Sequence, residues 1–348
     1  MNNLNYNLSS NQYLYNLGDN RGKIFNNKLS SNIHIQKRFY SCQFYTQVTK
    51  TSIVPLILNS WFITGFTDAE GCFNVSVSKR INTIRYEVQA RFIIELQLKD
   101  IDILLKIQSF FSGVGTISKN LTKNSCRYSV VSIVDINKFI IPHFKKYPLQ
   151  SVKSIDFDLW SQIINLLNDK KHLTPNGIIQ IVSLKSIMNF GLSKKLKLVF
   201  SNLIFLERKE YKPDNNKLNP YWISGFISGD GSFFITINKN NRVSAWLSIG
   251  LNARDKHLLD KIQNFFSGKG GIYFSNSKYN GVVEWKVFNI YDLVSISSHF
   301  ESYTLIGLKL KKFEIWKEIL PLIENKFSLT PEGLTQIKTL NNKLKELN

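Results

Sequence analysis

The chain has 348 residues, of which 43% are hydrophobic and 13% aromatic, so it can bury a sizeable core and is not disordered overall. Lys and Arg number 45 against 25 Asp and Glu, and the net charge of +20 favours a polyanionic partner, most commonly nucleic acid. Three scattered cysteines, and five histidines without the spacing of metal ligands, argue against a disulfide framework and a zinc site.

Residues 1–55 lie outside the pattern of the rest of the chain. They are rich in Asn, Ser and Tyr, and Asp19 is their one acidic residue among several Lys and Arg. Organelle-directing leaders are basic and poor in acids, although this stretch has little Arg for one. A leader and a translated extension without a role stay open as interpretations. The apolar run Ile53–Phe66 that overlaps its end is too short and too interrupted to span a membrane, so we expect no membrane partner.

Residues 56–206 have the pattern of one α+β module. The apolar segment Leu56–Glu70 has helical spacing and ends at Gly71, and a second helix, Asp102–Phe111, follows the first pair of strands. Two helices are expected at the end, the later one beginning at Thr174-Pro175, an N-cap followed by Pro at the first helical position. The predicted order is therefore αββαββα with four antiparallel strands. These strands are Cys72–Lys79, Tyr86–Leu98, Gly115–Ser118 and Tyr128–Ile133.

A polar linker, 207–219, precedes a second copy of this module at 220–348. At about 3.3–3.6 Å per residue the linker can reach roughly 45 Å, enough to cross a module. Three segments of the first copy return in order: Trp61–Gly71 as Trp222–Gly231, Lys106–Gly113 as Lys261–Gly268, and Leu173–Gly177 as Leu329–Gly333. The strands predicted for the second copy are Ser232–Lys239, Val243–Asn252, Gly271–Ser275 and Val282–Asn289. Two tandem modules related by a pseudo-two-fold axis are the expected architecture.

Small residues follow one face of the first helix in both modules. Gly65 and Ala69 are four residues apart, as are Gly225 and Gly229, so each pair shares a helix face. Small residues on such a stripe let two helix backbones approach closely. If the stripes face each other, we expect these two helices to pair across the axis.

Such a pairing would bring Glu70 and Asp230, the last acids of the two helices, close together. Close carboxylates repel each other unless a cation lies between them, and Mg²⁺ accepts such ligands together with water and phosphate oxygens. The alternative is two ordinary packed helices that end at glycines. An acid at the negative end of a helix dipole is unfavourable, and its occurrence twice at matching positions favours a function.

The two motifs, Ile63-Thr-Gly-Phe-Thr-Asp-Ala-Glu-Gly71 and Ile223-Ser-Gly-Phe-Ile-Ser-Gly-Asp-Gly231, resemble the paired signature of single-chain LAGLIDADG homing endonucleases. The resemblance covers about residues 56–348. It implies that Glu70 and Asp230 bind the catalytic metal, with two or more Mg²⁺ ions expected, and that saddle-shaped sheets lie in the DNA major groove. The second motif has Ser228 where the first has Asp68. We therefore expect asymmetric metal surroundings and unequal rates on the two strands.

The resemblance also implies further catalytic residues. Lys153 and Lys309 would stabilise charge that develops on a phosphate, and the alternative is that both are solvated lysines. Gln97 and Asn252 would order water around the metals, and a plain strand-end role is the alternative.

Alternate residues of the first strand pair in each module are expected to face DNA. Arg, Asn and Gln supply donors that read guanine and adenine edges, although a hydrated sheet face is the alternative for any single residue. The candidates are Asn74, Ser76, Ser78, Arg80, Arg85, Glu87, Gln89, Ser232, Thr236, Asn238, Asn240, Arg242, Ser244 and Trp246.

The sequence therefore predicts a monomeric, metal-dependent, site-specific endonuclease without an obligate protein partner. The resemblance implies an intron-encoded enzyme that cuts both strands of a long asymmetric DNA target and leaves 3′ overhangs. Usage heavy in Asn, Lys, Ile, Phe and Tyr suits an AT-rich organelle genome, so a mitochondrion is expected, with a chloroplast second. The alternatives are a maturase that binds intron RNA, alone or in addition, and a DNA-binding protein whose cleavage has decayed.

Overall fold

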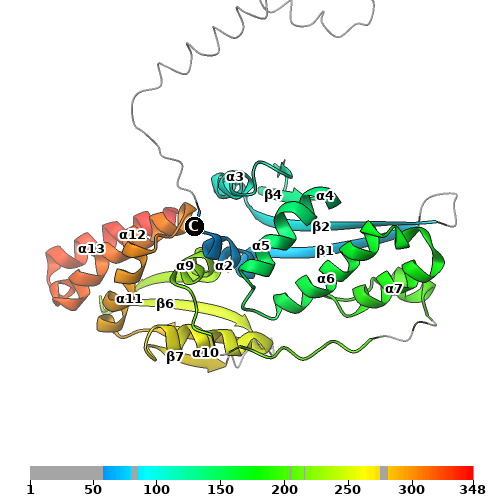
Figure 1. The fold of residues 1–348 in the computed structure, drawn as a ribbon. Coiled ribbons are helices and arrows are strands. Elements are labelled where there is room, and N and C mark those ends of the chain that lie inside the picture. Colours follow the sequence, from blue (N-terminus) through cyan, green and yellow to red (C-terminus); the bar gives the residue numbers. More distant parts are fainter. Residues whose placement is uncertain are drawn as a thin grey trace, which may run out of the picture. The chain divides into compact units, whose positions relative to one another are not determined.

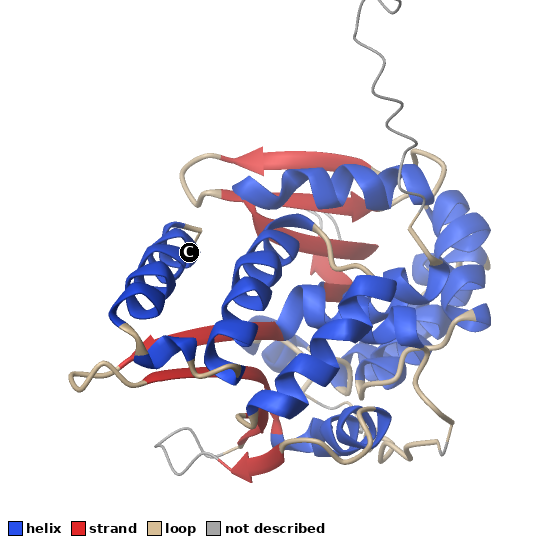
Figure 2. Ribbon diagram, turned by 90° about the vertical axis from the view of Figure 1, so that its left-hand side faces the viewer, coloured by secondary structure: helices blue, strands red, loops and turns tan. Residues whose placement is uncertain are grey.

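The computed structural model describes residues 58–79, 85–201, 203, 206–214, 216–274 and 281–347. The expected leader at 1–55, the candidate Arg80 and the predicted strand end at Ser275 lie outside these residues. The described part contains two copies of a helix followed by a four-stranded antiparallel sheet and more helices, which confirms the predicted α+β class (Figures 1 and 2). No helix within these ranges combines the length and apolarity needed to cross a membrane.

In the first half, a helix leads directly into a sheet with the strand order β1-β2-β4-β3. Its elements up to the last strand are α2 (Ser60–Glu70), β1 (Gly71–Lys79), β2 (Tyr86–Gln97), α3 (Ile101–Phe110), β3 (Thr116–Asn120) and β4 (Ser125–Val130). A helical run follows, formed by α4 (Ile133–Asp135), a π-helical turn (Ile136–Ile140) and α5 (Ile141–Lys146). The half ends with α6 (Lys153–Asn168), α7 (Pro175–Ser186) and α8 (Lys194–Val199).

The second half repeats this order with the strand order β5-β6-β8-β7. Its helix and first strands are α9 (Pro220–Asp230), β5 (Gly231–Ile237) and β6 (Val243–Asn252). These are followed by α10 (Lys256–Phe265), β7 (Gly271–Phe274), β8 (Val282–Val287), α11 (Ile290–Ser302), α12 (Gly307–Glu324) and α13 (Pro331–Glu346). In Figure 1, α2 and α9 lie side by side between the two sheets.

The prediction of two helices after each sheet was wrong, because a further helix begins where the last strand was expected to continue. The side chain of Ser132 accepts a hydrogen bond from Asp135 N and ends the extended chain at the start of α4. Asn289 does the same for α11 by accepting from Tyr291 N and Asp292 N. A capping side chain at these positions favours helix over strand.

Aromatic side chains fill the space between each sheet and its helices. Phe73 on β1 packs against Phe92 on β2 and Trp160 on α6, with ring centroids 5.4 and 5.2 Å away. Trp160 Nε1 donates to the backbone oxygen of Asn74. In the second half Phe233 on β5 packs against Phe313 and Trp316 on α12. The inner face of each sheet is therefore committed to the core, and the outer face carries the alternate side chains.

A histidine anchors each central helix, buried in the first half and half-buried in the second. The Thr64 hydroxyl on α2 lies 3.2 Å from His143 Nε2 and also donates to a backbone carbonyl. Ser224 on α9 has the same relation to His299. Burial lowers the pKa of both histidines to about 4, so both are neutral in the folded protein near pH 7.

These histidines predict a loss of stability in mild acid. An unfolded histidine titrates near pH 6.5, so below that pH the unfolded chain takes up protons that the folded chain does not bind until about pH 4. We expect the free energy of unfolding to be unaffected by these groups above pH 6.5 and to fall by up to a few kcal/mol, as an order of magnitude, between pH 6.5 and 4. Urea unfolding at a series of pH values measures this. The double variant His143→Gln and His299→Gln should show a shallower fall, and an equal fall would contradict the prediction.

Candidate active site

The stripes of small residues on α2 and α9 face each other. A Cβ atom added to Gly65 would lie 2.0 Å from the backbone oxygen of Trp222, and one added to Gly225 would lie 2.1 Å from that of Phe62. Real Cβ atoms do not approach a backbone atom so closely. The two helix backbones are therefore in contact at a distance that only glycine permits.

This contact continues to the ends of the helices, where the two acids lie. A Cβ at Gly229 would meet Ala69 Cβ at 2.5 Å and Glu70 Cγ at 3.0 Å, so the Glu70 side chain lies directly beside the residue before Asp230. Burial, and next the charge of Glu70, raise the pKa of Asp230 to about 6. Burial also raises the pKa of Glu70, while Lys153 and Lys309 act to lower it. The arrangement is a pair of half-buried carboxylates that repel each other.

A cleft of about 550 Å³ opens beside this pair. Glu70, Gln97, Asp100 and Lys309 line it, so it carries charged groups of both signs. Its lining comes from both halves of the chain, which places the cleft at the junction that the helix ends form.

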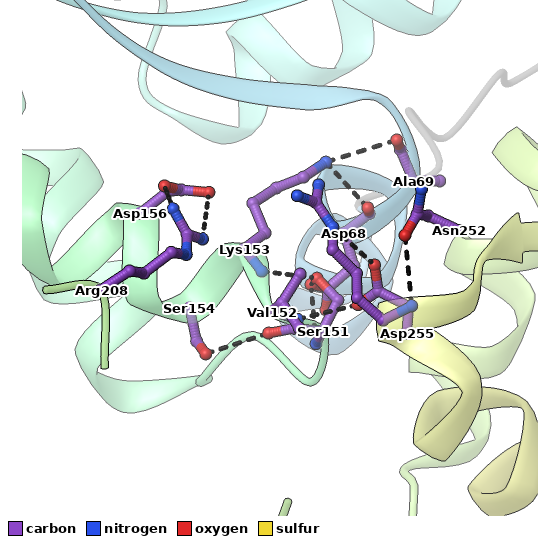
Figure 3. A network of polar contacts seen from close by, with 11 residues as sticks. Asp68, Ala69, Ser151, Val152, Lys153, Ser154, Asp156, Arg208, Asn252 and Asp255 are labelled. Atoms are coloured by element: carbon purple, nitrogen blue, oxygen red, sulfur yellow. Dashed lines mark hydrogen bonds and ion pairs between the residues drawn. The ribbon is translucent and has the colours of Figure 1, made fainter. Parts of the chain in front are cut away.

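The two lysines predicted from the sequence lie at the same helix ends. Lys153 Nζ donates to the backbone oxygen of Asp68 at 2.8 Å (Figure 3) and to that of Thr67 at 2.9 Å. Its positive charge therefore offsets the negative end of the α2 dipole. Lys309 Nζ donates to the backbone oxygen of Gly231, directly after α9. Burial lowers the pKa of each lysine, and the nearby acids act to raise it.

The helices that carry the two lysines, α6 and α12, each begin beside an aspartate of the other half. The sequence did not predict these contacts. Asp255, just after β6, accepts a hydrogen bond from Val152 N at 3.0 Å, directly before Lys153 (Figure 3). Asp100, just after β2, accepts one from Leu308 N at 3.2 Å, directly before Lys309. The halves therefore hold each other's lysines in position.

Asymmetric metal surroundings were expected because Asp68 has no carboxylate counterpart in the second half, and the structure shows which groups Asp68 contacts. Asp68 is buried, and its carboxylate accepts hydrogen bonds from Gln150 N at 2.9 Å, from the Ser151 hydroxyl at 2.6 Å and from Trp222 Nε1 at 2.8 Å. These donors occupy it and tie α2, α9 and the loop before Lys153 together. Ser228, at the matching position of α9, instead donates its hydroxyl hydrogen bond to Ser224 O. The two positions therefore differ in the helix and loop contacts that they make.

Gln97 and Asn252 end equivalent strands but differ in their surroundings. Gln97 is exposed and lines the cleft beside Glu70. The side chain of Asn252 accepts from Arg254 N at 3.2 Å and caps the turn after β6. Gln97 is thus the better placed of the two to contact water near the acids.

A family model described as LAGLIDADG endonuclease matches residues 63–164 and 223–320, which contain both acids. The chain belongs to the LAGLIDADG endonuclease family. This confirms the resemblance drawn from the two motifs.

Curated relatives and solved structures agree with this assignment. The chain is 37% identical over 324 residues to a probable intron-encoded endonuclease 2 of Neurospora crassa, covering 89% of this chain and 70% of the relative. It is 36% identical to a probable intron-encoded endonuclease 3 of the same fungus. That alignment covers 82% of this chain and 54% of the relative. Among solved structures, the homing endonuclease I-GzeII in complex with its DNA target is similar with a TM-score of 0.76 and 33% identity, covering 82% of this chain and 97% of that one. I-SmaMI bound to uncleaved DNA in the presence of calcium ions has a TM-score of 0.76 and 32% identity and covers 82% of this chain and 98% of that one.

The linker at 207–219 of this LAGLIDADG protein contacts both halves. Arg208 forms an ion pair with Asp156 on α6 at 2.8 Å. Tyr211 packs on His257 of α10, with ring centroids 4.4 Å apart. Further along, Lys261 bonds to the linker at Asp214. The linker therefore adds contacts between the halves beyond those of the helix pair.

Most sequence-predicted DNA contacts lie on the outer faces of the sheets. In the first half Asn74, Ser76 and Ser78 of β1 share a face with Glu87 and Gln89 of β2. Arg85 is exposed just before β2. In the second half the outer-face candidates are Ser232, Thr236, Ser244 and Trp246.

The remaining candidates lie in the exposed turn between β5 and β6. Asn238 accepts from Asn240 N and Arg242 N, so its side chain shapes the turn. Sequence reasoning missed several outer-face residues that the same alternation extends to. They are Arg91, Glu95, Arg127 and Phe234.

Proposed function

We propose that this member of the LAGLIDADG family is a site-specific endonuclease that cuts both strands of a long, asymmetric DNA target. One observation carries the proposal: Glu70 and Asp230 lie together at the ends of two helices that join two sheets with solvent-facing outer surfaces. Because the two halves differ in their outer-face side chains, the target has two different half-sites. Because one chain supplies both halves, it acts as a monomer.

The residues at the helix ends fit a divalent metal, for which Mg²⁺ is our proposal. The charge of Glu70 helps to raise the pKa of Asp230, and two carboxylates this close gain from a cation between them. Mg²⁺ takes one or two carboxylates and completes its shell with water and phosphate oxygens. Within the described ranges no group of three or more His, Cys, Asp or Glu forms an alternative site. Glu70 and Asp230 would hold the metal, which when bound supplies water activation and charge neutralisation at the phosphodiester.

The surrounding side chains assist at defined atoms. The ammonium groups of Lys153 and Lys309 lie one at each helix end, where each can stabilise charge on one scissile phosphate. Gln97 can hold a water in the cleft beside Glu70. We propose that each half serves one strand and that the cut leaves 3′ overhangs.

The maturase alternative is not favoured. A splicing role on RNA does not need two facing acids, and both are present here with a lysine at each helix end. The relatives carry names of intron-encoded endonucleases, and the amino-acid usage suits an AT-rich organelle genome. We propose the mitochondrion as the location, with the chloroplast second.

Cleavage of uninterrupted host-gene DNA tests the function. We expect the wild-type chain with Mg²⁺ to cut this duplex once and to stop cutting when EDTA removes the metal. The double variant Glu70→Gln and Asp230→Asn should bind the duplex and leave both strands intact, and each single variant should slow cleavage by at least about 100-fold, as for loss of one charge-stabilising group.

The failure modes of this assay are distinct. If the wild type binds duplexes and cuts none of them, the protein is a DNA-binding protein without cleavage activity. Cutting by the double variant would remove the two acids from the mechanism. Stimulated splicing of a precursor RNA without DNA cleavage would support the maturase.

A further inference from the structure

The outer faces of the two sheets carry opposite chemistry at equivalent positions. In the first half Asn74 of β1 is the cross-strand partner of Arg91 of β2. In the second half the pair at the same place in the ladder is Phe234 of β5 and Trp246 of β6. An amide and a guanidinium in one half are therefore replaced by two aromatic rings in the other.

The aromatic pair belongs to a larger exposed cluster. The rings of Phe234 and Trp246 are stacked, with centroids 5.0 Å apart and planes at 18°. Phe288, at the end of β8, lies 6.2 Å from Trp246, and Tyr273 of β7 lies 6.4 Å from Phe288. Phe234, Tyr273 and Phe288 are 40, 49 and 54% exposed. An apolar cluster of this kind on an otherwise polar sheet face marks an interaction site.

The edges of these rings suit the major groove of a duplex. Because Phe234 and Trp246 stack on each other, each ring has one face covered by the other, whereas a single-stranded base needs a free face to stack on. In a duplex the base faces are covered, and thymine alone presents a methyl group in the major groove. Serine and threonine side chains flank the cluster at Ser244 and Thr236, as expected of a surface that also contacts polar base edges.

We propose that the second half of the protein reads its half-site through thymine methyl groups, which contact Phe234, Trp246 and Phe288. The first half reads its half-site by hydrogen bonds from Asn74 and Arg91. This inference rests on the proposed binding of DNA by the outer sheet faces. It adds that specificity has a different physical basis in each half and that the second half-site contains thymines where the cluster contacts it.

Replacing thymine by uracil tests this directly, because uracil keeps every base-pairing group and loses only the methyl. Target duplexes are first selected by binding to the full-length chain from a randomised library, once with the wild type and once with Phe234→Ala. Positions whose thymine preference depends on Phe234 identify the second half-site. Binding of the selected duplex is then measured with single thymine-to-uracil replacements, in Ca²⁺ without cleavage.

We expect about fourfold weaker binding for each methyl removed at these positions, as for the loss of one buried methyl group. Phe234→Ala should bind the thymine and uracil duplexes equally, whereas the matched variant Asn74→Ala should keep the full uracil penalty. Equal uracil effects in both half-sites, or a full penalty in Phe234→Ala, would overturn the inference. So would tighter binding to single-stranded RNA than to the duplex, which would assign the rings to base stacking.

Binding and cleavage separate this inference from the proposed function. A chain that shows the uracil penalty without cutting would leave the thymine contacts standing and refute the nuclease. A chain that cuts its target without a uracil penalty would refute the thymine contacts alone.

Discussion

Alanine at Gly65 or Gly225 is expected to destabilise the protein by more than about 3 kcal/mol, at or beyond the upper range for overpacking a core. The added Cβ would lie about 2 Å from a backbone oxygen of the facing helix, at Trp222 and Phe62 respectively. A side chain can rotate away from such a clash, but a helix backbone can relieve it only by separating α2 from α9. Urea unfolding of the two variants measures the loss.

Gly250→Ala is the matched control, because the nearest atom to its added Cβ is Glu284 Cγ at 3.5 Å, an ordinary contact. This variant should unfold within about 1 kcal/mol of the wild type, the scale of a surface strand substitution. If Gly65→Ala were as stable as Gly250→Ala, the close approach of the two helices would be wrong. Separation of the helices should also abolish DNA cleavage, because it moves Glu70 away from Asp230.

Methionine at Lys153 or Lys309 is expected to slow DNA cleavage by about 100- to 1000-fold while DNA binding stays within about tenfold. Each ammonium group is buried at the end of a motif helix, beside the acid pair. Methionine keeps most of the side-chain volume and removes the charge. Single-turnover cleavage, with strands labelled separately, shows which strand each lysine serves.

Lys311→Met is the control on the same helix as Lys309. Lys311 is exposed, and its substitution removes the same charge from the protein. It should weaken DNA binding slightly and leave the cleavage rate of the bound complex unchanged. Equal rates for Lys309→Met and Lys311→Met would contradict a role for Lys309 at the phosphate. Thermal unfolding of Lys153→Met separates loss of its helix-end contacts from loss of catalysis.

The fold could be predicted from the sequence because the same module occurs in two copies, so each signal is seen twice. The glycine spacing predicted that Gly65 contacts α9 and that Gly225 contacts α2. The Thr-Pro pairs predicted helices that begin after Thr174 and Thr330, and both threonine side chains accept the capping hydrogen bonds. The helix count failed where Ser132 and Asn289 cap new helices, because an isolated capping residue after a β-rich run resembles a strand end.

The site was predicted less completely, since contacts between halves have no local signal. Asp100 and Asp255 follow equivalent strands, but nothing in their neighbourhood shows that each meets the backbone of the other half. Asp68 was the reason for expecting asymmetric metal surroundings, and it proved to be a buried acceptor. Its donor Trp222 lies 154 residues away in sequence, so no local pattern shows this contact. Phe234 was absent from the DNA-facing candidates, although its parity with Ser232 and Thr236 places it on the outer face.

Anomalous diffraction from Mn²⁺ in crystals of the protein with its DNA target most directly tests whether the facing acids form the metal site. We expect one or more manganese peaks within coordination distance of the carboxylates of Glu70 and Asp230 and of a phosphate oxygen. Crystals of the double variant Glu70→Gln and Asp230→Asn should lack these peaks. Strong peaks confined to other residues, with none between the two helix ends, would contradict the proposed catalytic centre.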